Sequence, residues 1–302
     1  MIERLKSLFR LAAVAGLLAI AVPASAQQKQ PPPADDGVKV TRPSRATAFA
    51  SSEEIERAAT TQYDLLKREA AAKRALAPAD HPTVLRLRAI AERIIPFAPR
   101  FNERATQWKW EVNLLGSRQI NAFCMPGGKI AFYNGIITQL NLTDDEIAMV
   151  MGHEIAHALM EHGRERLGKE RVAKGLTMGA SILSAILGYG DLGGQLAGGA
   201  AQLTLLKYSR DDETEADVVG LDLAARAGYD PRAAIVLWDK MSAASKGSPP
   251  QWLSTHPSNT SRTAEIRKHL KTTLPLYARA VGVPVEQLPP YATNSPPPAA
   301  RR

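Results

Sequence analysis

The chain has 302 residues, with 38 Lys and Arg against 30 Asp and Glu, which gives a formal net charge of +8. This moderate positive charge is compatible with weak contact to a membrane surface, but no nucleic-acid-binding motif accompanies it, so nucleic acid is not an expected partner. The single cysteine, Cys124, excludes an internal disulfide and is expected to be a small buried residue.

The first 26 residues have the pattern of a secretory signal peptide. A basic start is followed by an apolar stretch from Leu11 to Val22 and by the small-residue cleavage pattern Ala24-Ser25-Ala26. The apolar stretch is short for a membrane span, and no cysteine stands at the cleavage site to accept a lipid. We therefore expect a soluble exported protein, periplasmic in a Gram-negative bacterium.

One domain is expected between two less ordered ends. A flexible leader covers residues 27–50, and a proline-rich tail covers 271–302. Residues 51–270 are enough for one domain with a sizeable core, and no internal repeat is evident. Long helical patterns outnumber short strand candidates, which predicts a mainly helical α+β domain with a small sheet. The helical patterns cover about 53–77, 82–95, 143–169, 211–227 and 231–244, and the strand candidates lie near 108–115 and 119–137.

The segment 119–137 has the pattern of a hairpin. Two short apolar stretches flank the turn sequence Pro126-Gly127-Gly128. Such a strand could lie along a substrate cleft with an open edge, where an extended peptide adds by backbone hydrogen bonds. A plain edge hairpin without contact to substrate is the alternative.

The start of the helix predicted over 143–169 has its own signal. Thr143 is followed by Glu146 three positions later, which predicts a capping box. Apolar residues then recur at helical spacing from Ile147 to Leu159, so this helix is expected to face the core.

The same helix carries an HExxH run from His153 to His157. On a helix this spacing places two imidazoles on one face, where they can bind a zinc ion. Buried imidazoles without partners would be costly, and a metal is the economical partner. Glu154 could take a proton from water at the metal and pass it to a leaving amine. The motif therefore predicts a zinc protease.

A catalytic zinc usually has three protein ligands, so a third must lie elsewhere in the chain. Met160 and Gly163 occupy positions where the longer motif HExxHxxGxxH requires glycine and histidine, which excludes that pattern. No acidic residue lies between residues 170 and 191, which excludes the thermolysin-like spacing. In the next acidic cluster, Glu213 and Asp217 are four residues apart and share a helix face.

Taken together, these motifs resemble the M48 family of metallopeptidases, the group that includes HtpX-like, Oma-type and CAAX prenyl proteases. The resemblance covers roughly residues 55 to 270. It is carried by HExxH, the run SRxxExEADxxG from Ser209 to Gly220, Ala-Gly-Tyr-Asp-Pro at 227–231, the stretch from Asn121 to Ile130, His256-Pro257, and Arg262.

The resemblance implies a zincin-type metallopeptidase domain with one zinc ion per chain and a small sheet beside the active-site helix. By the same resemblance, His153, His157 and Glu213 are the zinc ligands, and Asp217 is a carboxylate that orients a ligand histidine. Glu215 lies about 200 degrees round the helix from Glu213, so it is expected to be solvated.

Two downstream residues keep alternative roles. His256 could stabilise the tetrahedral oxyanion or contact the zinc and hold the enzyme shut, as in some relatives, or be purely structural. Arg262 could assist the oxyanion or pair with a carboxylate, or form an ordinary surface salt bridge. The expected substrate-binding residues are Asn121, Ala122 and Phe123 in the hairpin, together with Arg262.

The resemblance implies an endopeptidase that acts on protein or peptide substrates, with misfolded or mis-assembled envelope proteins as the expected substrates. A latent or catalytically silent zinc-binding chaperone or scaffold is the alternative. Glu154 argues against the silent form, because a structural zinc site has no use for a general base.

The apolar, glycine-rich segment from Leu176 to Leu206 has two interpretations. Two short helices could form a movable cover over the zinc site, or they could dip into a membrane surface.

Overall fold

The structure is a computed structural model that describes residues 36–40, 44–174, 208–245, 251–256 and 260–294. The helices and strands of these residues belong to one compact unit, 37–302. The predicted signal peptide and the glycine-rich segment 176–206 lie outside the described residues.

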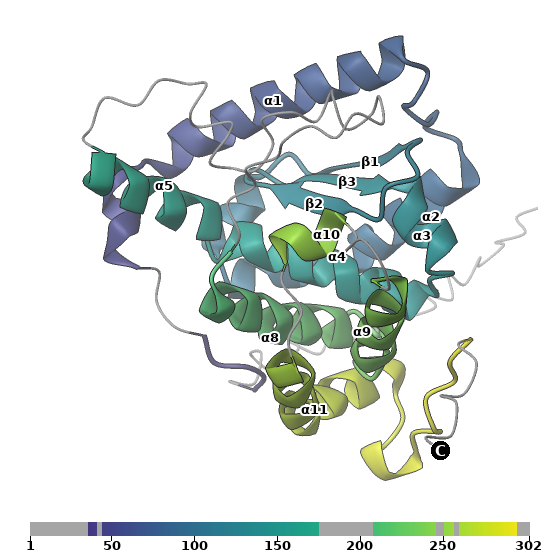
Figure 1. Ribbon diagram of the computed structural model, residues 1–302. Coiled ribbons are helices and arrows are strands. Elements are labelled where there is room, and N and C mark those ends of the chain that lie inside the picture. Colours follow the sequence, from purple (N-terminus) through teal and green to yellow (C-terminus); the bar gives the residue numbers. More distant parts are fainter. Residues whose placement is uncertain (1–35, 41–43, 175–207, 246–250, 257–259, 295–302) are drawn as a thin grey trace, which may run out of the picture. The chain divides into compact units, whose positions relative to one another are not determined.

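Within these residues the fold is mainly helical, with one small sheet, as predicted (Figure 1). The α-helices are α1 (Ser52–Ala72), α2 (Pro82–Ile94), α3 (Asn134–Gln139), α4 (Asp144–Leu159), α5 (His162–Lys174), α8 (Arg210–Arg226), α9 (Ala233–Ala244), α10 (Gln251–Thr255) and α11 (Thr260–Val281). The strands are β1 (Glu111–Leu115), β2 (Ala122–Met125) and β3 (Lys129–Tyr133), and short 3₁₀ helices cover Arg45–Phe49, Ile95–Arg100, Glu103–Gln107 and Val285–Gln287.

The sheet has the order β1-β3-β2, with β1 parallel and β2 antiparallel to β3. The hairpin prediction is confirmed, since β2 and β3 flank a turn in which Gly127 and Gly128 have φ angles of 82° and 76°. These angles suit glycine because it has no Cβ to clash. Helix α1 crosses one face of the sheet and α4 lies under the other (Figure 1). Strand β2 is therefore an edge strand beside α4.

Helix α4 begins where the sequence predicts and ends earlier. The Thr143 side chain accepts from the Glu146 amide, and the Glu146 carboxylate accepts from the Thr143 amide, so the predicted capping box is confirmed. The prediction of one helix over 143–169 was wrong, because the chain turns at Glu161, whose φ is 58°. The Glu161 carboxylate accepts hydrogen bonds from Arg164 and Ser52, which stabilises this turn.

Two glycines bring α4 and α8 into close contact. A Cβ added at Gly152 would lie 2.7 Å from the Gly220 carbonyl oxygen, and one added at Gly220 would lie 2.7 Å from the His153 amide nitrogen. Any larger residue would force the two backbones apart. The small residues thus allow side chains of α8 to reach the HExxH face of α4.

The ends of the expected domain differ from the prediction. Helix α11 continues from Thr260 to Val281, although the domain was predicted to end at residue 270 and a proline-rich tail to begin at 271. Its buried Ile266, Leu276 and Ala278 hold it against the rest of the fold. In the leader, the Val38 amide donates to the Asp222 carboxylate, and a 3₁₀ helix forms at Arg45–Phe49. The structured region thus extends beyond residues 51–270 on both sides.

Two smaller findings concern single features. Cys124 is buried in β2, as predicted. Among the described residues, no helix is both long enough and apolar enough to cross a membrane.

Candidate metal centre

Four buried side chains from three regions of the chain converge at the C-terminal half of α4. His153 and His157 come from α4, Glu213 comes from the first turn of α8, and His256 follows α10. One ligand atom from each residue lies within 4.8 Å of the others. All four residues are at most 4% exposed. The group thus contains the three predicted zinc ligands and one further histidine.

The distances between these atoms suit a tetrahedral zinc. Zinc lies about 2.0–2.1 Å from its nitrogen and oxygen ligands, so tetrahedral ligands are about 3.3 Å apart. The His153 and His157 Nε2 atoms are 3.1 Å apart, and His157 Nε2 is 3.5 Å from Glu213 Oε1. Burial lowers the pKa of His157 well below its usual value, and the neighbouring histidines act in the same direction. A neutral imidazole is the form that binds a metal, so the residues present fit zinc.

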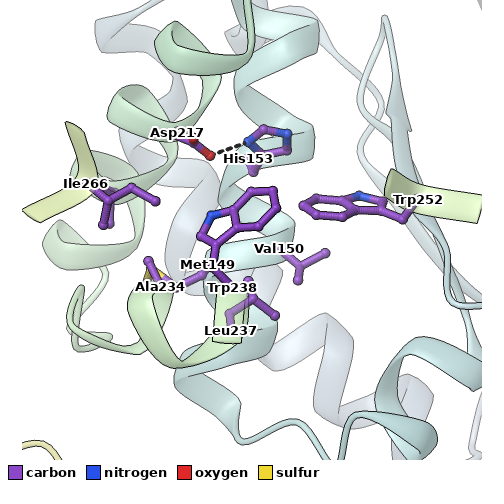
Figure 2. Close-up of a pocket in the computed structure, with 10 residues that line it drawn as sticks. Met149, Val150, His153, Asp217, Ala234, Leu237, Trp238, Trp252 and Ile266 are labelled. Carbon is purple, nitrogen blue, oxygen red and sulfur yellow. Dashed lines mark ion pairs between the residues drawn. The ribbon is translucent and has the colours of Figure 1, made fainter. Parts of the chain in front are cut away.

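Asp217 lies behind His153, one turn along α8 from Glu213. Its Oδ1 is 3.1 Å from His153 Nδ1, and Figure 2 shows this carboxylate directed at the ring. A carboxylate at Nδ1 favours a proton there and leaves the Nε2 lone pair for a metal. The predicted position of Asp217 beside a ligand histidine therefore matches the geometry.

Arg262 is fully buried and joins two carboxylates of α8, Asp217 and Glu213. Its Nε and Nη2 each donate to Asp217 at 2.7 Å, and its Nη1 lies 2.6 Å from Glu213 Oε2. Burial opposes ionisation of Asp217, but Arg262 and His153 outweigh it and lower the pKa of that carboxyl to about 2. Of the alternatives for Arg262, the structure has the carboxylate pair, and this pair is buried rather than at the surface.

His256 faces the metal group directly. Its Nδ1 lies 3.1 Å from His153 Nε2 and 3.0 Å from Glu213 Oε1, which is the position of a fourth ligand. Its other nitrogen, Nε2, is 3.7 Å from Glu154 Oε1. Burial disfavours the charged ring, but the carboxylates of Glu213 and Glu154 outweigh burial and raise the pKa of His256. Catalytic zinc sites keep one position open, so this arrangement corresponds to a closed site.

Trp252 covers Glu154 and was not predicted from the sequence. Its Nε1 donates to Glu154 Oε1 at 2.6 Å, and its ring stacks on His256 with centroids 4.9 Å apart. The Trp252 backbone amide also donates to the Ile120 carbonyl, just before β2. The sequence did contain one indication that Trp252 lies beside His256: the two residues are four positions apart, which is about one helical turn.

A small cavity of about 20 Å³ lies behind His153 and is lined mainly by apolar residues of α4 and α9. Figure 2 shows the indoles of Trp238 and Trp252 beside it. Its volume is about that of one water molecule, so it offers no room for a substrate side chain in this conformation.

Only some backbone groups of the predicted substrate-binding strand point away from β3. The Asn121 carbonyl accepts from the Tyr133 amide, and because hydrogen bonding alternates along an antiparallel strand, Phe123 also bonds to β3. The backbone groups of Ala122 and Cys124 therefore point to the other edge of β2. The Asn121 side chain accepts from the Ala122 amide at 3.0 Å. The Phe123 ring is buried, in edge contact with Tyr63 on the α1 side of the sheet.

His162 and Glu215 also contact this centre. No sequence pattern indicated a role for His162, and Glu215 was predicted to be solvated. His162 Nδ1 lies 2.8 Å from His157 Nδ1, and His162 Nε2 lies 3.1 Å from Glu215 Oε2. The Glu215 side chain is 21% exposed. Glu215 is therefore only partly exposed rather than fully solvated, because its carboxylate contacts the buried His162 at the start of α5.

An HExxH helix that meets a glutamate from a second helix, beside the edge strand of a small sheet, defines the class of zinc metallopeptidases. The model of peptidase family M48 matches residues 83–270, which is more than half of the chain. The chain belongs to peptidase family M48, as its motifs suggested.

Its relatives include mitochondrial and bacterial proteases. The chain is 35% identical over 196 residues to mitochondrial metalloendopeptidase OMA1 of Schizosaccharomyces pombe, covering 64% of this chain and 55% of that protein. It is 35% identical over 167 residues to the human mitochondrial metalloendopeptidase OMA1, covering 52% and 32%. With the β-barrel assembly-enhancing protease of Escherichia coli it shares 30% over 176 residues, covering 55% and 36%. The chain thus spans about half or less of the length of these relatives.

Proposed function

We propose that this protein is a zinc-dependent endopeptidase in which His153, His157 and Glu213 hold the metal. The observation that carries the proposal is the convergence of these three ligand atoms, with Glu154 next to His153 on the same helix. Zinc bound there would supply Lewis-acid chemistry, polarising a peptide carbonyl and making water a stronger acid. This ligand set is the minimum for a catalytic zinc site.

The other residues of the centre have separate tasks in this proposal. Glu154 is the general base, and the carboxylate that takes the proton from water returns it to the leaving amine. Asp217 holds the His153 ring. Arg262 holds Asp217 through two hydrogen bonds and Glu213 through an ion pair. An extended substrate adds to the β2 edge at Ala122 and Cys124, which makes recognition depend on backbone more than on side chains.

We propose misfolded or mis-assembled cell-envelope proteins as substrates and the periplasm as the location. The support is the predicted signal peptide at residues 1–26 and the similarity to a protease named for β-barrel assembly. Weak contact with a membrane surface stays a prediction from the positive charge and from the glycine-rich segment 176–206.

Zinc dependence is the first test. The purified mature chain is expected to contain one zinc per chain, measured by mass spectrometry of the metal. Casein cleavage is expected to stop with a chelator and to return with added zinc. This holds for the wild type or, if the wild type is latent, for the variant His256→Ala. Full metal occupancy without cleavage in either protein would contradict the proposal.

A latent form of the same enzyme is the second candidate, and the position of His256 favours it. His256 Nδ1 occupies the fourth ligand position, while Trp252 binds the proposed base, so both water and substrate are kept from the centre. A closed ligand set is also what a silent zinc-binding scaffold would have.

His256→Ala separates latency from silence. Its expected effect is an increase in casein cleavage of about tenfold or more, because the fourth ligand position becomes free for water. The measurement is the initial rate at equal zinc occupancy. The matched control is His269→Ala, which removes a half-buried histidine of α11 that contacts the Glu265 carbonyl, and it should leave the rate unchanged. An unchanged low rate in His256→Ala would favour the scaffold.

A further inference from the structure

A chain of hydrogen-bonding groups extends from the metal centre to α5 and ends on α8. His157 Nδ1 contacts His162 Nδ1 at 2.8 Å, and His162 Nε2 contacts Glu215 Oε2 at 3.1 Å. His157 and His162 are each 3% exposed. His157 thus contacts His162 through Nδ1, whereas its other ring nitrogen, Nε2, faces His153.

The chain reversal at Glu161 makes this contact. In a continuous helix, residue 162 would lie about 140° round the axis from residue 157, on a different face. Instead α4 ends at Leu159, Glu161 has a φ of 58°, and α5 begins at His162. The turn therefore brings the His162 ring back to His157.

One arrangement of protons along these hydrogen bonds leaves the Nε2 lone pair of His157 available to a metal. The Glu215 carboxylate only accepts hydrogen bonds, so it favours the proton of His162 on Nε2. His162 Nδ1 is then an acceptor and favours the proton of His157 on Nδ1. The lone pair of His157 is left on Nε2, where the metal group converges.

We propose that His162 and Glu215 are positioning residues for the zinc ligand His157, and that they set its tautomer and ring orientation. They do for His157 what Asp217 does for His153, but through an intermediate imidazole. Helix α8 then supplies Glu213 to the metal, Asp217 to one ligand histidine and Glu215 to the other. This inference depends on the proposed ligand set, which zinc binding by the wild type tests separately.

Substitution of His162 tests whether its Nδ1 acts as the hydrogen-bond acceptor for His157. His162→Leu removes the acceptor and is expected to weaken zinc binding about 10- to 100-fold, the usual effect of losing a group that orients a ligand. His162→Asn places an amide oxygen near the position of Nδ1 and is expected to recover most of the affinity. The measurement is the zinc dissociation constant from competition with a chromophoric chelator, with circular dichroism to show that each variant is folded.

Substitution of Glu215 tests the rest of the chain. Glu215→Leu is expected to weaken zinc binding, whereas Glu215→Gln can still accept from His162 through its amide oxygen and should stay close to the wild type. Because the effect of Glu215 passes through His162, Glu215→Leu should have little further effect in the His162→Asn background.

Asp222→Asn is the matched control on α8. Asp222 is buried and paired with Arg226, away from the metal group, so this variant is expected to lose stability but not zinc affinity. Equal zinc affinity in wild type and His162→Leu would overturn the inference alone. Equal losses in His162→Leu and His162→Asn would overturn it as well. Failure of the wild type to bind zinc, or of His157→Ala to weaken binding, would overturn the ligand set together with it.

Discussion

Glu154→Gln is expected to lower casein cleavage by about 10²- to 10⁴-fold while zinc stays bound, because the amide cannot take a proton from water. The fold around residue 154 should be retained, since the glutamine oxygen can accept the Trp252 Nε1 hydrogen bond as the carboxylate does. The measurements are zinc content and the cleavage rate, each in the wild-type and the His256→Ala background.

The matched control is Glu146→Gln, a buried carboxylate two turns earlier on α4. Glutamine can keep the capping interaction with Thr143, although the ion pair with Lys240 is lost. Cleavage should therefore persist in this control below its unfolding temperature. If Glu154→Gln cleaved as fast as the control at equal zinc occupancy, Glu154 would not be the base.

Arg262→Leu is expected to lower the free energy of unfolding of the zinc-free protein by about 3–5 kcal/mol, the usual cost of breaking a buried ion pair. The reason is that two buried carboxylates, Asp217 and Glu213, lose the cation that they share. The measurement is urea unfolding in the presence of a chelator. Arg262→Lys should recover only part of the loss, because an ammonium group cannot bind Asp217 with two parallel hydrogen bonds.

The loss in Arg262→Leu should depend on pH in a defined direction. In the wild type, Arg262 and His153 hold the pKa of Asp217 at about 2, below its ordinary value of about 3.9. The resulting stability is present above the ordinary pKa and is lost as the pH falls toward 2. In the variant the unpaired carboxyl can take up a proton at higher pH, so the difference between the two proteins should shrink from pH 7 to pH 4. A difference of less than 1 kcal/mol at pH 7 would show that the pair contributes little.

Local signals determined much of the fold. The capping box at Thr143 and the glycine turn of the hairpin are short-range patterns with a defined backbone geometry, and both were predicted correctly. The end of α4 was not, because a positive φ at Glu161 depends on contacts of its side chain with Ser52 and Arg164. Ser52 lies far away in the sequence, so no local pattern could indicate it.

The candidate site divides in the same way. HExxH predicts two ligands and a base because helical periodicity alone places them together. The same periodicity places Glu213 and Asp217 on one face of a second helix, but only the resemblance to the family predicted their roles. The sequence could not show how closely these helices approach, which depends on Gly152 meeting Gly220.

The sequence by itself predicted zinc chemistry and the proposed ligands His153 and His157, since these depend on residue types at fixed helical spacing. The family, and with it Glu213 as the third proposed ligand, followed from motifs spread along the sequence. Only the tertiary structure decided that His256 takes the fourth ligand position, that Arg262 is buried between two carboxylates, and that His162 contacts His157. Each of these contacts joins separate elements, and their distances depend on helix packing and chain reversal rather than on local periodicity.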